Sequence, residues 1–498
     1  GSFSYDSNYQ YDYLSAASVG KIEPGEFRDA AAANVFAAEG DETLEAVSAT
    51  TANPDSTVQV EVYLLDSDAA DPTDGTLAAS QTETVEYGGY HTIALDEPVA
   101  LSAGQRFSVV ERIEGYEGAY LPLEVAAYDA NDPDESQGGY VKAQRAVANA
   151  GESFYSADGG ATWSDVTELS ADEVQKRISP SRFGGYPQVN AEDGVGNVMI
   201  KAFTTDGTEP EPEPEPGPDP EEPDDPALRS SFDPREEGLA TPVRDQGATD
   251  LCGPFASMAS LETSLVYDGA ASDELVEAGL SPFHAVYFAT MGDEEREAGG
   301  LNAFMPDNPY GGGISPFTIA NSLAAGKGAV IAREGQTDAA YEPMDEALRF
   351  ASDVRLTGTA ALGLAGGGYW ETLEGDALRA AVKRVIAEEG PAVAEFCSQR
   401  GPNFSWENSC YYTAPGETGY AADHYVAVVG WDDEFPRARF NEAMRPESDG
   451  AWLVKNSWGT DQGDAGYFWI SYEDATLDVQ AALFGEAKRA DEAVYQYD

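Results

Sequence analysis

The sequence predicts two folded domains of different class: an all-β domain, followed by a domain that combines helices with strands. Three observations support this prediction. Apolar and polar residues alternate within the first 205 residues, and a stretch of acids and prolines follows. The remainder contains both a segment with apolar residues at helical spacing and a valine-rich segment typical of a strand. At 498 residues the chain is long enough to bury a separate core in each domain.

Residues 3–205 are predicted to form a β-sandwich. Every second residue from Val58 to Leu64 is apolar, and the alternation recurs at Phe107 and Val109. We expect the last strand of this domain at 198–203. Residues 156–163 read Ser-Ala-Asp-Gly-Gly-Ala-Thr-Trp, the pattern called an Asp-box. We interpret it as a structural turn shaped by its acid and glycines, with the tryptophan packed beneath, rather than as a catalytic motif.

Two further motifs of this region are shared with a known domain family. They read Tyr-Gln-Tyr-Asp at 9–12 and Gly-Gly-Tyr-His-Thr-Ile at 88–93. On these residues the region resembles the lectin-like β-sandwich of Gram-positive surface proteins. The resemblance implies carbohydrate or a cell-surface glycan as a partner. A plain spacer or docking domain is the alternative.

Residues 206–228 are predicted to be a linker, because they contain acids and prolines and no basic residue. Like charges and prolines keep such a segment extended, so we expect few contacts between the domains that it joins. The tail, 489–498, ends in the same Tyr-Gln-Tyr-Asp tetrapeptide as 9–12. We expect it to begin a further β-domain. The alternatives are coincidence or a strand added to one of the two domains.

The charge of the chain restricts its partners. Acidic residues number 90 against 28 basic ones, for a formal net charge of −62. Phosphate groups would be repelled, which disfavours nucleic acid and anionic membranes as partners. No run of 18 apolar residues predicts a transmembrane helix. We expect an extracellular protein, secreted or attached to the cell wall, with a salt-tolerant protein as the alternative.

Three distant segments contain the residue types of a thiol active site. Gln246 precedes Cys252 by six residues, His424 stands before a valine-rich strand, and Asn456 opens the sequence Asn-Ser-Trp-Gly. A thiol becomes a good nucleophile only as thiolate, which needs a base or a cation beside it. The residues after Cys252 predict a helix whose positive end would favour the thiolate. The positions that share its spacing are Phe255, Met258, Ala259, Glu262 and Leu265.

In this order the three segments resemble the papain family of cysteine peptidases. The resemblance implies a two-lobed α+β domain in which His424 pairs with the Cys252 thiolate and protonates the leaving amine. Asn456 would orient the imidazole, and Gln246 would donate its amide to the oxyanion. Trp458 would cover the Asn–His hydrogen bond.

The resemblance covers residues 229–488 and includes departures from the family pattern. Leu251 and Gly253 flank the thiol, Thr249 replaces a customary cysteine, and Asp250 places a negative charge nearby that would raise the thiol pKa. The sequence thus predicts a cysteine endopeptidase that acts on polypeptides through a thioester. A non-catalytic surface adhesion protein with a degenerate peptidase fold is the alternative.

The resemblance also implies that Gly312 and Gly313 pair with the substrate backbone, where an ordinary turn is the alternative. Cys397 and Cys410 lie 13 residues apart, and we expect them to form a disulfide that leaves Cys252 as the odd thiol. The alternative is three reduced cysteines. His284 is interpreted as a packed histidine. No Cys-x-x-Cys pair is present and histidines number three, so neither a metal nor a cofactor is expected.

Overall fold

The computed structural model describes most of both predicted domains. Within the described residues, no helix is long and apolar enough to cross a membrane. The described residues are 5–12, 19–22, 30–51, 54–115, 118–125, 127–129, 146–176, 187–189, 191, 194–207, 229–290, 310, 314–332, 344–362, 375–487 and 493–496.

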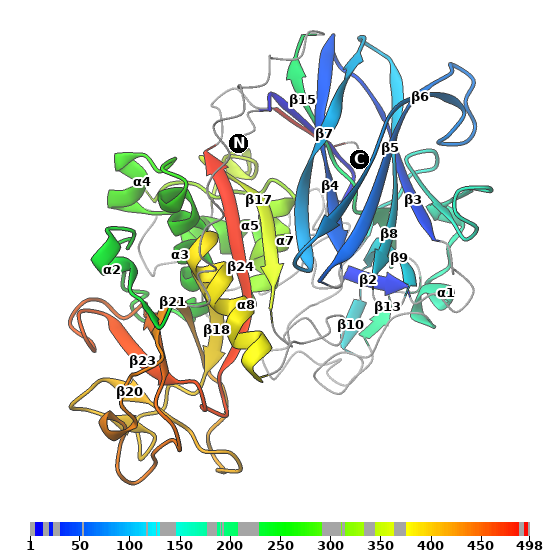
Figure 1. Ribbon diagram of the computed structural model, residues 1–498. Helices are drawn as coiled ribbons and strands as arrows, with labels where there is room; N and C mark the ends of the chain where they lie inside the picture. The colour runs from blue at the N-terminus through cyan, green and yellow to red at the C-terminus, as the bar shows by residue number, and fades with distance from the viewer. Residues whose placement is uncertain are drawn as a thin grey trace.

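The N-terminal domain is a sandwich of two sheets (blue to cyan in Figure 1). Alternate side chains of its strands point into a shared core, as predicted: Val58, Val60 and Val62 are buried. One sheet contains β1 (Ser7–Gln10), β15 (Ala202–Asp206), β4 (Glu42–Thr51) and β7 (Gly89–Leu101). The other is built on β3 (Ala31–Ala37), β8 (Arg106–Gly115), β5 (Ser56–Leu65) and β6 (Gly75–Val85).

Shorter elements close the sandwich at one end, and one of them corrects a prediction. The single strand expected at 198–203 is wrong, because β14 ends at Val198 against the second sheet and β15 begins at Ala202 against the first. The chain crosses between the sheets at 199–201. The remaining elements are β2 (Val19–Ile22), β9 (Gly118–Val125), β10 (Ala127–Asp129), β11 (Ser153–Ser156), β12 (Ser164–Asp165), η1 (Val166–Glu168), α1 (Ala171–Gln175), β13 (Pro187–Val189) and β14 (Val195–Val198).

The Asp-box forms the turn between β11 and β12. Asp158 accepts hydrogen bonds from the backbone and the hydroxyl of Thr162, both at 2.8 Å. These bonds are the main reason why the pKa of Asp158 is lowered. Trp163 packs against a small apolar cluster beside the turn. The motif is structural, as its pattern predicts.

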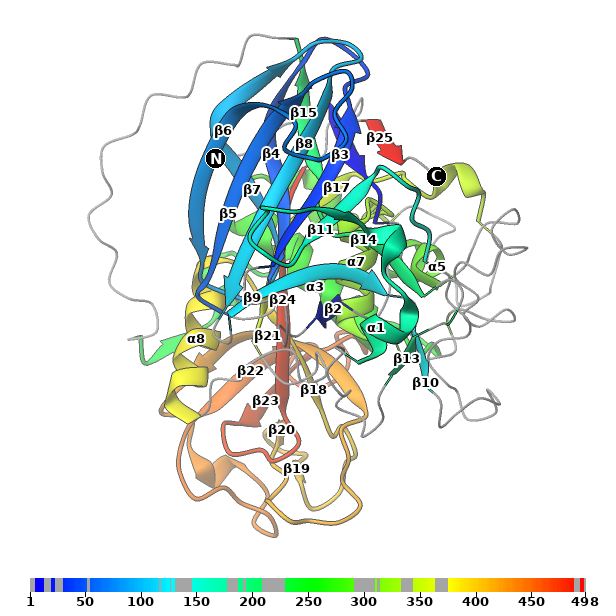
Figure 2. The ribbon, with the colours of Figure 1, turned by 90° about the vertical axis from the view of Figure 1, so that its right-hand side faces the viewer.

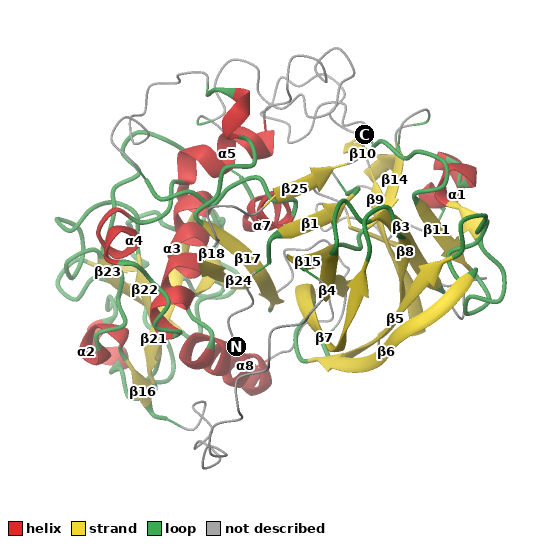
Figure 3. Ribbon diagram, turned by 90° about the horizontal axis from the view of Figure 1, so that it is seen from above, coloured by secondary structure: helices red, strands yellow, loops and turns green. Residues whose placement is uncertain are grey.

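The C-terminal domain has two lobes, seen in Figure 3 as helices and strands on the side opposite the sandwich. One lobe holds most of the helices: α3 (Cys252–Tyr267), α4 (Asp273–Ala278), α5 (Pro282–Thr290) and α7 (Pro316–Ala324). The other is a sheet lobe with α8 packed on it (Figure 2). It comprises α8 (Gly375–Glu388), β18 (Ala392–Phe396), β19 (Phe404–Ser405), β20 (Cys410–Tyr411), β21 (His424–Asp432), β22 (Ala451–Lys455) and β23 (Tyr467–Ser471). The short elements β16 (Ser231–Phe232) and α2 (Pro234–Glu237) precede both lobes.

The two domains share one continuous sheet, so the expectation of few contacts between them is wrong. Strand β24 (Asp478–Ala487) pairs with β17 (Val354–Ala361), which in turn pairs with β7 of the sandwich. Figure 1 shows β17 beside β24 at this junction. The Thr359 hydroxyl accepts a 2.8 Å hydrogen bond from the backbone N–H of Tyr90. A linker can be extended while the domains that it joins still pack together. Residues 208–228 of the predicted linker lie outside the described residues.

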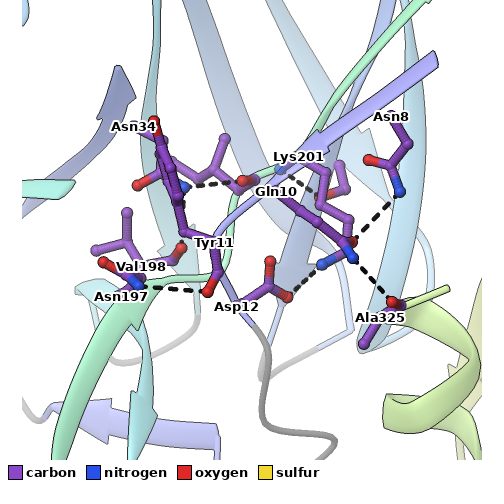
Figure 4. Close-up of polar contacts among 11 residues, drawn as sticks. Asn8, Gln10, Tyr11, Asp12, Asn34, Asn197, Val198, Lys201 and Ala325 are labelled. Atoms are coloured by element: carbon purple, nitrogen blue, oxygen red, sulfur yellow. Dashed lines mark hydrogen bonds and ion pairs between the residues drawn. The ribbon is translucent and has the colours of Figure 1, made fainter. Parts of the chain in front are cut away.

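The first Tyr-Gln-Tyr-Asp copy lies in this junction (Figure 4). Gln10 donates a 2.8 Å hydrogen bond to the carbonyl of Ala325 in the C-terminal domain. Asp12 forms a buried ion pair with Lys201. Both are buried, so this tetrapeptide connects the core of the sandwich to the neighbouring domain.

Part of the tail contributes a strand, β25 (Ala493–Gln496), that pairs in parallel with β1. The register places Tyr495 opposite Tyr9 and Gln496 opposite Gln10, so the first two residues of each copy of the tetrapeptide lie side by side. This is the arrangement in which the tail adds a strand to the β-domain. The prediction that the tail begins a further domain stays a prediction.

Candidate active site

Cys252 is the first residue of α3, as the sequence predicts. The helix is buried on nearly all sides rather than along one face, because it passes through the centre of the domain between α5 and α7 on one side and β21 and β24 on the other. Leu251 precedes the helix without a side-chain cap. The N–H groups of the first turn are therefore not occupied by a capping side chain, and their partial positive charge lies next to the thiol.

The surroundings of the thiol act on its pKa in both directions. Burial raises the pKa of Cys252, and the charge of Asp250 adds to that shift. Hydrogen bonds from the backbone N–H groups of Tyr425 and Gly253 oppose it. The contact with Tyr425 places the thiol at the start of β21, the strand whose first residue is His424.

His424, Asn456 and Trp458 are brought together as a unit. The Asn456 Oδ1 atom lies 2.7 Å from His424 Nε2, and it also accepts a 2.8 Å bond from the backbone N–H of Ser457. The amide oxygen thus faces the imidazole, which makes Nε2 the donor and Nδ1 the acceptor of the neutral ring. The Trp458 ring stacks on the imidazole at 4.5 Å and an interplanar angle of 27°. Burial lowers the pKa of His424, while its bond to Asn456 opposes that shift.

Gln246 is fixed between the thiol segment and the asparagine segment. Its Oε1 accepts a 2.6 Å hydrogen bond from the Ser457 hydroxyl, and its Nε2 donates to the carbonyl of Thr249 at 2.8 Å. An amide nitrogen carries two hydrogens, so one of them is not used by the bond to Thr249.

The glycine after the nucleophile has a structural cause. A Cβ atom at Gly253 would lie 2.3 Å from the carbonyl oxygen of Ile314. This close approach explains why no large side chain follows Cys252. Gly312 and Gly313, which precede Ile314 closely in the chain, lie outside the described residues, so their pairing with substrate stays a prediction.

A buried ion cluster beneath the site was missed by the sequence reasoning. Glu262 of α3 binds Arg244 at 2.9 Å and lies 3.6 Å from Lys455. Burial lowers the pKa of Lys455 to about 8, and the charge of Glu262 opposes that shift. Because Lys455 directly precedes Asn456, the cluster fixes the strand end that bears the asparagine. A charged residue at an otherwise apolar helix position was the available signal.

The predicted disulfide between Cys397 and Cys410 is wrong, since both thiols are free. Tyr411 points into the sheet lobe, where its ring lies 5.0 Å from that of Phe396. Successive residues of a strand face opposite sides, so Cys410 points away. It packs in a different apolar cluster and donates to the carbonyl of Arg439 at 3.2 Å.

We expect thiol titration with a chromogenic disulfide to find all three cysteines reduced after denaturation without reductant. In the native protein the buried Cys397 and Cys410 should react slowly. If only one thiol reacted after denaturation, the original prediction of a Cys397–Cys410 disulfide would be correct.

The other two histidines are packed residues. His284 of α5 lies 2.9 Å from the carbonyl of Leu348, and burial lowers its pKa to about 4. His91 of β7 contacts the Thr51 hydroxyl at 3.1 Å, and burial likewise lowers its pKa to about 4. Neither lies in the site, and for His284 this agrees with the sequence interpretation.

Comparison with protein families and solved structures matches both domains. Residues 8–176 match the lectin-like domain, and residues 369–486 match the papain family cysteine protease. A cathepsin L-like peptidase of Aedes aegypti is 25% identical over 246 residues, which are 49% of this chain and 60% of that protein. Cathepsin L of Sarcophaga peregrina is 28% identical over 48% of this chain and 57% of that protein. The chain thus spans somewhat over half the length of these relatives.

Among solved structures, the cysteine protease and lectin-like domains of Cwp84, a surface layer associated protein of Clostridium difficile, superpose with a TM-score of 0.40. The identity is 26%, and the match covers 53% of each chain. Bromelain from Ananas comosus superposes with a TM-score of 0.35 at 18% identity, over 52% of this chain and 100% of that one.

The site thus combines a cysteine at the start of the central helix α3 with a histidine at the start of β21. The C-terminal domain is thus papain-like, since residues 369–486 match the papain family cysteine protease, and a lectin-like domain matched by residues 8–176 lies at its N-terminal side.

Proposed function

We propose that this protein is a cysteine endopeptidase that cleaves polypeptides through a thioester on Cys252. The single observation that supports it best is the oriented His424–Asn456 pair at 2.7 Å, beside a thiol at the start of a helix. A degenerate fold would have no physical need for the imidazole orientation, the stacked indole and the anchored glutamine amide together.

The reaction begins with transfer of the thiol proton to His424 Nδ1. Burial disfavours the charged form of each group taken alone, so the thiolate–imidazolium pair depends on the mutual attraction of its members. The thiolate attacks the peptide carbonyl, and the oxyanion receives the second Gln246 N–H and a backbone N–H at Cys252. The imidazolium then protonates the leaving amine, and water hydrolyses the thioester with His424 as base.

The lectin-like domain and the net charge of the chain support a proposal about where the enzyme acts. We propose that the enzyme works outside the cell, secreted or attached to the wall, and that the sandwich holds it near a glycan-bearing surface. Its support is the family of the N-terminal domain and the net charge of −62, which suits an aqueous environment rather than nucleic acid or an anionic membrane.

An epoxide inhibitor of papain-like enzymes tests the proposal. We expect covalent labelling of the native protein at Cys252 alone, because Cys397 and Cys410 are almost fully buried. Peptide mapping by mass spectrometry identifies the labelled residue, and iodoacetamide after denaturation shows that all three thiols were available. Native protein that is not labelled at any pH, or that is labelled at a different cysteine, would support the non-catalytic adhesion protein instead.

A further inference from the structure

Arg400 lies beside the catalytic unit although no part of the predicted site includes it. It belongs to the loop that follows β18. Its guanidinium carbon is 5.3 Å from the centroid of the Trp458 ring. That ring in turn stacks on the imidazole of His424 at 4.5 Å. A cation and the catalytic imidazole therefore contact the same indole.

The guanidinium group is held by hydrogen bonds and by rings. Nε donates to the Tyr411 hydroxyl at 3.1 Å, and Nη1 donates to Oε1 of Gln462, also at 3.1 Å. Tyr411 is itself buried in the sheet lobe. Two bonds from a planar fork fix both the position and the plane of the group. The rings of Phe404, Trp406 and Phe468 surround it, with centroids 5.0, 5.2 and 5.6 Å from the guanidinium carbon.

The loop that bears Arg400 is also fastened to the strand of the catalytic histidine. The backbone N–H of Ser398 donates to Asp423 Oδ1 at 2.7 Å, and the backbone N–H of Asp423 donates to the carbonyl of Phe396 at 3.0 Å. Asp423 directly precedes His424. The loop is thus attached on one side to the imidazole's own strand and on the other to the indole that covers the imidazole.

We propose that Arg400 is a positioning residue that holds the Trp458 indole against His424. Trp458 is only half-buried, so packing alone does not fix its ring over the imidazole. Attraction between the indole face and the guanidinium, which Gln462 and Tyr411 hold in place, supplies the missing constraint. An indole kept in place excludes water from the His424–Asn456 bond. The inference rests on the proposed function, whose turnover it supports.

Direct binding of substrate by Arg400 is the rival role, and the structure favours positioning. The third guanidinium nitrogen, Nη2, is buried and has no hydrogen-bond partner among the described residues. The other two nitrogens are engaged with Tyr411 and Gln462. Two of the three guanidinium nitrogens thus have protein partners, and the third is shielded from solvent.

The test compares Arg400→Met, which keeps the length of the stem, with Arg400→Lys, which keeps the charge. Trp406→Ala is the matched control, because Trp406 also contacts the guanidinium but is 70% exposed and does not touch Trp458 in the described structure. Activity is measured per active site titrated by the epoxide inhibitor, with peptides that bear glutamate or lysine after the scissile bond. The pH dependence of Cys252 alkylation by iodoacetamide is measured in parallel.

For Arg400→Met we expect kcat per titrated site to fall about tenfold, with KM unchanged and the same loss for both peptides. Arg400→Lys should recover part of the loss, and Trp406→Ala should retain full activity. The basic limb of the alkylation profile should move to higher pH in Arg400→Met. Water admitted to the imidazole weakens the desolvation that lowers the pKa of His424, while Asn456 and Asp423 still favour its protonated form.

Three results would overturn the inference. An unchanged kcat per titrated site, with fewer titratable sites, would show a structural role only. A loss confined to one peptide, or expressed in KM, would show substrate binding. An unchanged pH dependence of Cys252 alkylation would show that Arg400 does not affect the pKa of His424. If the wild-type protein cleaves no peptide, the proposed function fails, whereas the alkylation profiles still decide the role of Arg400.

Discussion

Replacing His424 with alanine is expected to lower peptide hydrolysis by at least about 10³-fold while the protein remains folded. The imidazole is the base that receives the Cys252 proton and the acid that releases the amine, so its loss removes two steps at once. Cys252→Ala should be equally inactive, because no thioester can form. Hydrolysis of an unstructured polypeptide, measured per milligram of folded protein, gives the comparison.

The chain supplies its own control in His284. This histidine is also buried and also has a pKa lowered by burial, yet its partner is a backbone carbonyl in the helical lobe. His284→Gln should lower the temperature of unfolding and leave kcat per titrated site unchanged. Activity that survives in His424→Ala and disappears in His284→Gln would move the base to the other histidine.

Asn456→Ala should reduce activity less than His424→Ala. The asparagine accepts a hydrogen bond from the imidazole and fixes its orientation, but it exchanges no proton with substrate. The stacked Trp458 ring still restricts the imidazole in this variant. The comparison of the two variants therefore separates orientation from chemistry.

The sequence predicts correctly those parts of the molecule whose structure is determined by a local pattern of residue types. A helix was expected after Cys252, and it begins at that residue. Period-two alternation placed Val58, Val60 and Val62 in the core of the sandwich, because only a strand with one buried face produces that pattern. The proximity of His424 and Asn456 followed from a resemblance in motif order rather than from local periodicity. Their catalytic roles stay predictions until they are measured.

The wrong predictions have a different physical origin, because each depends on which distant segment of the chain a residue or strand packs against. The spacing of Cys397 and Cys410 suits a disulfide, but the side of the strand on which Cys410 faces depends on where Tyr411 packs. The break at 199–201 depends on two sheets competing for one segment. Sheet pairing between domains leaves no local signature either, since β7 and β17 read as ordinary strands.

Because the two domains pair in one sheet, removal of residues 1–205 is expected to destabilise the peptidase domain. A chain that starts at residue 206 is expected to unfold about 5–10 °C lower than the full chain and to aggregate. Truncation exposes the edge of β17, which pairs with β7 in the intact protein. It also removes the rings of Tyr5 and Phe203, whose centroids lie 4.1 and 5.1 Å from the Arg355 guanidinium. Arg355 is largely buried, so its charge would lose favourable contacts without becoming fully hydrated.

Cleaving the linker without removing either domain tests the domain interface separately from the effects of truncation. A specific protease site placed between residues 208 and 228 allows the linker of the folded protein to be cleaved. We expect the two halves to elute together in size-exclusion chromatography and to keep full activity on a small peptide, because the shared sheet and the Gln10–Ala325 bond do not depend on the linker. Arg355→Met should weaken this association by removing the cation that spans the junction. Halves that separate at once after cleavage, with the peptidase half soluble and active alone, would show that the linker rather than the sheet holds the domains together.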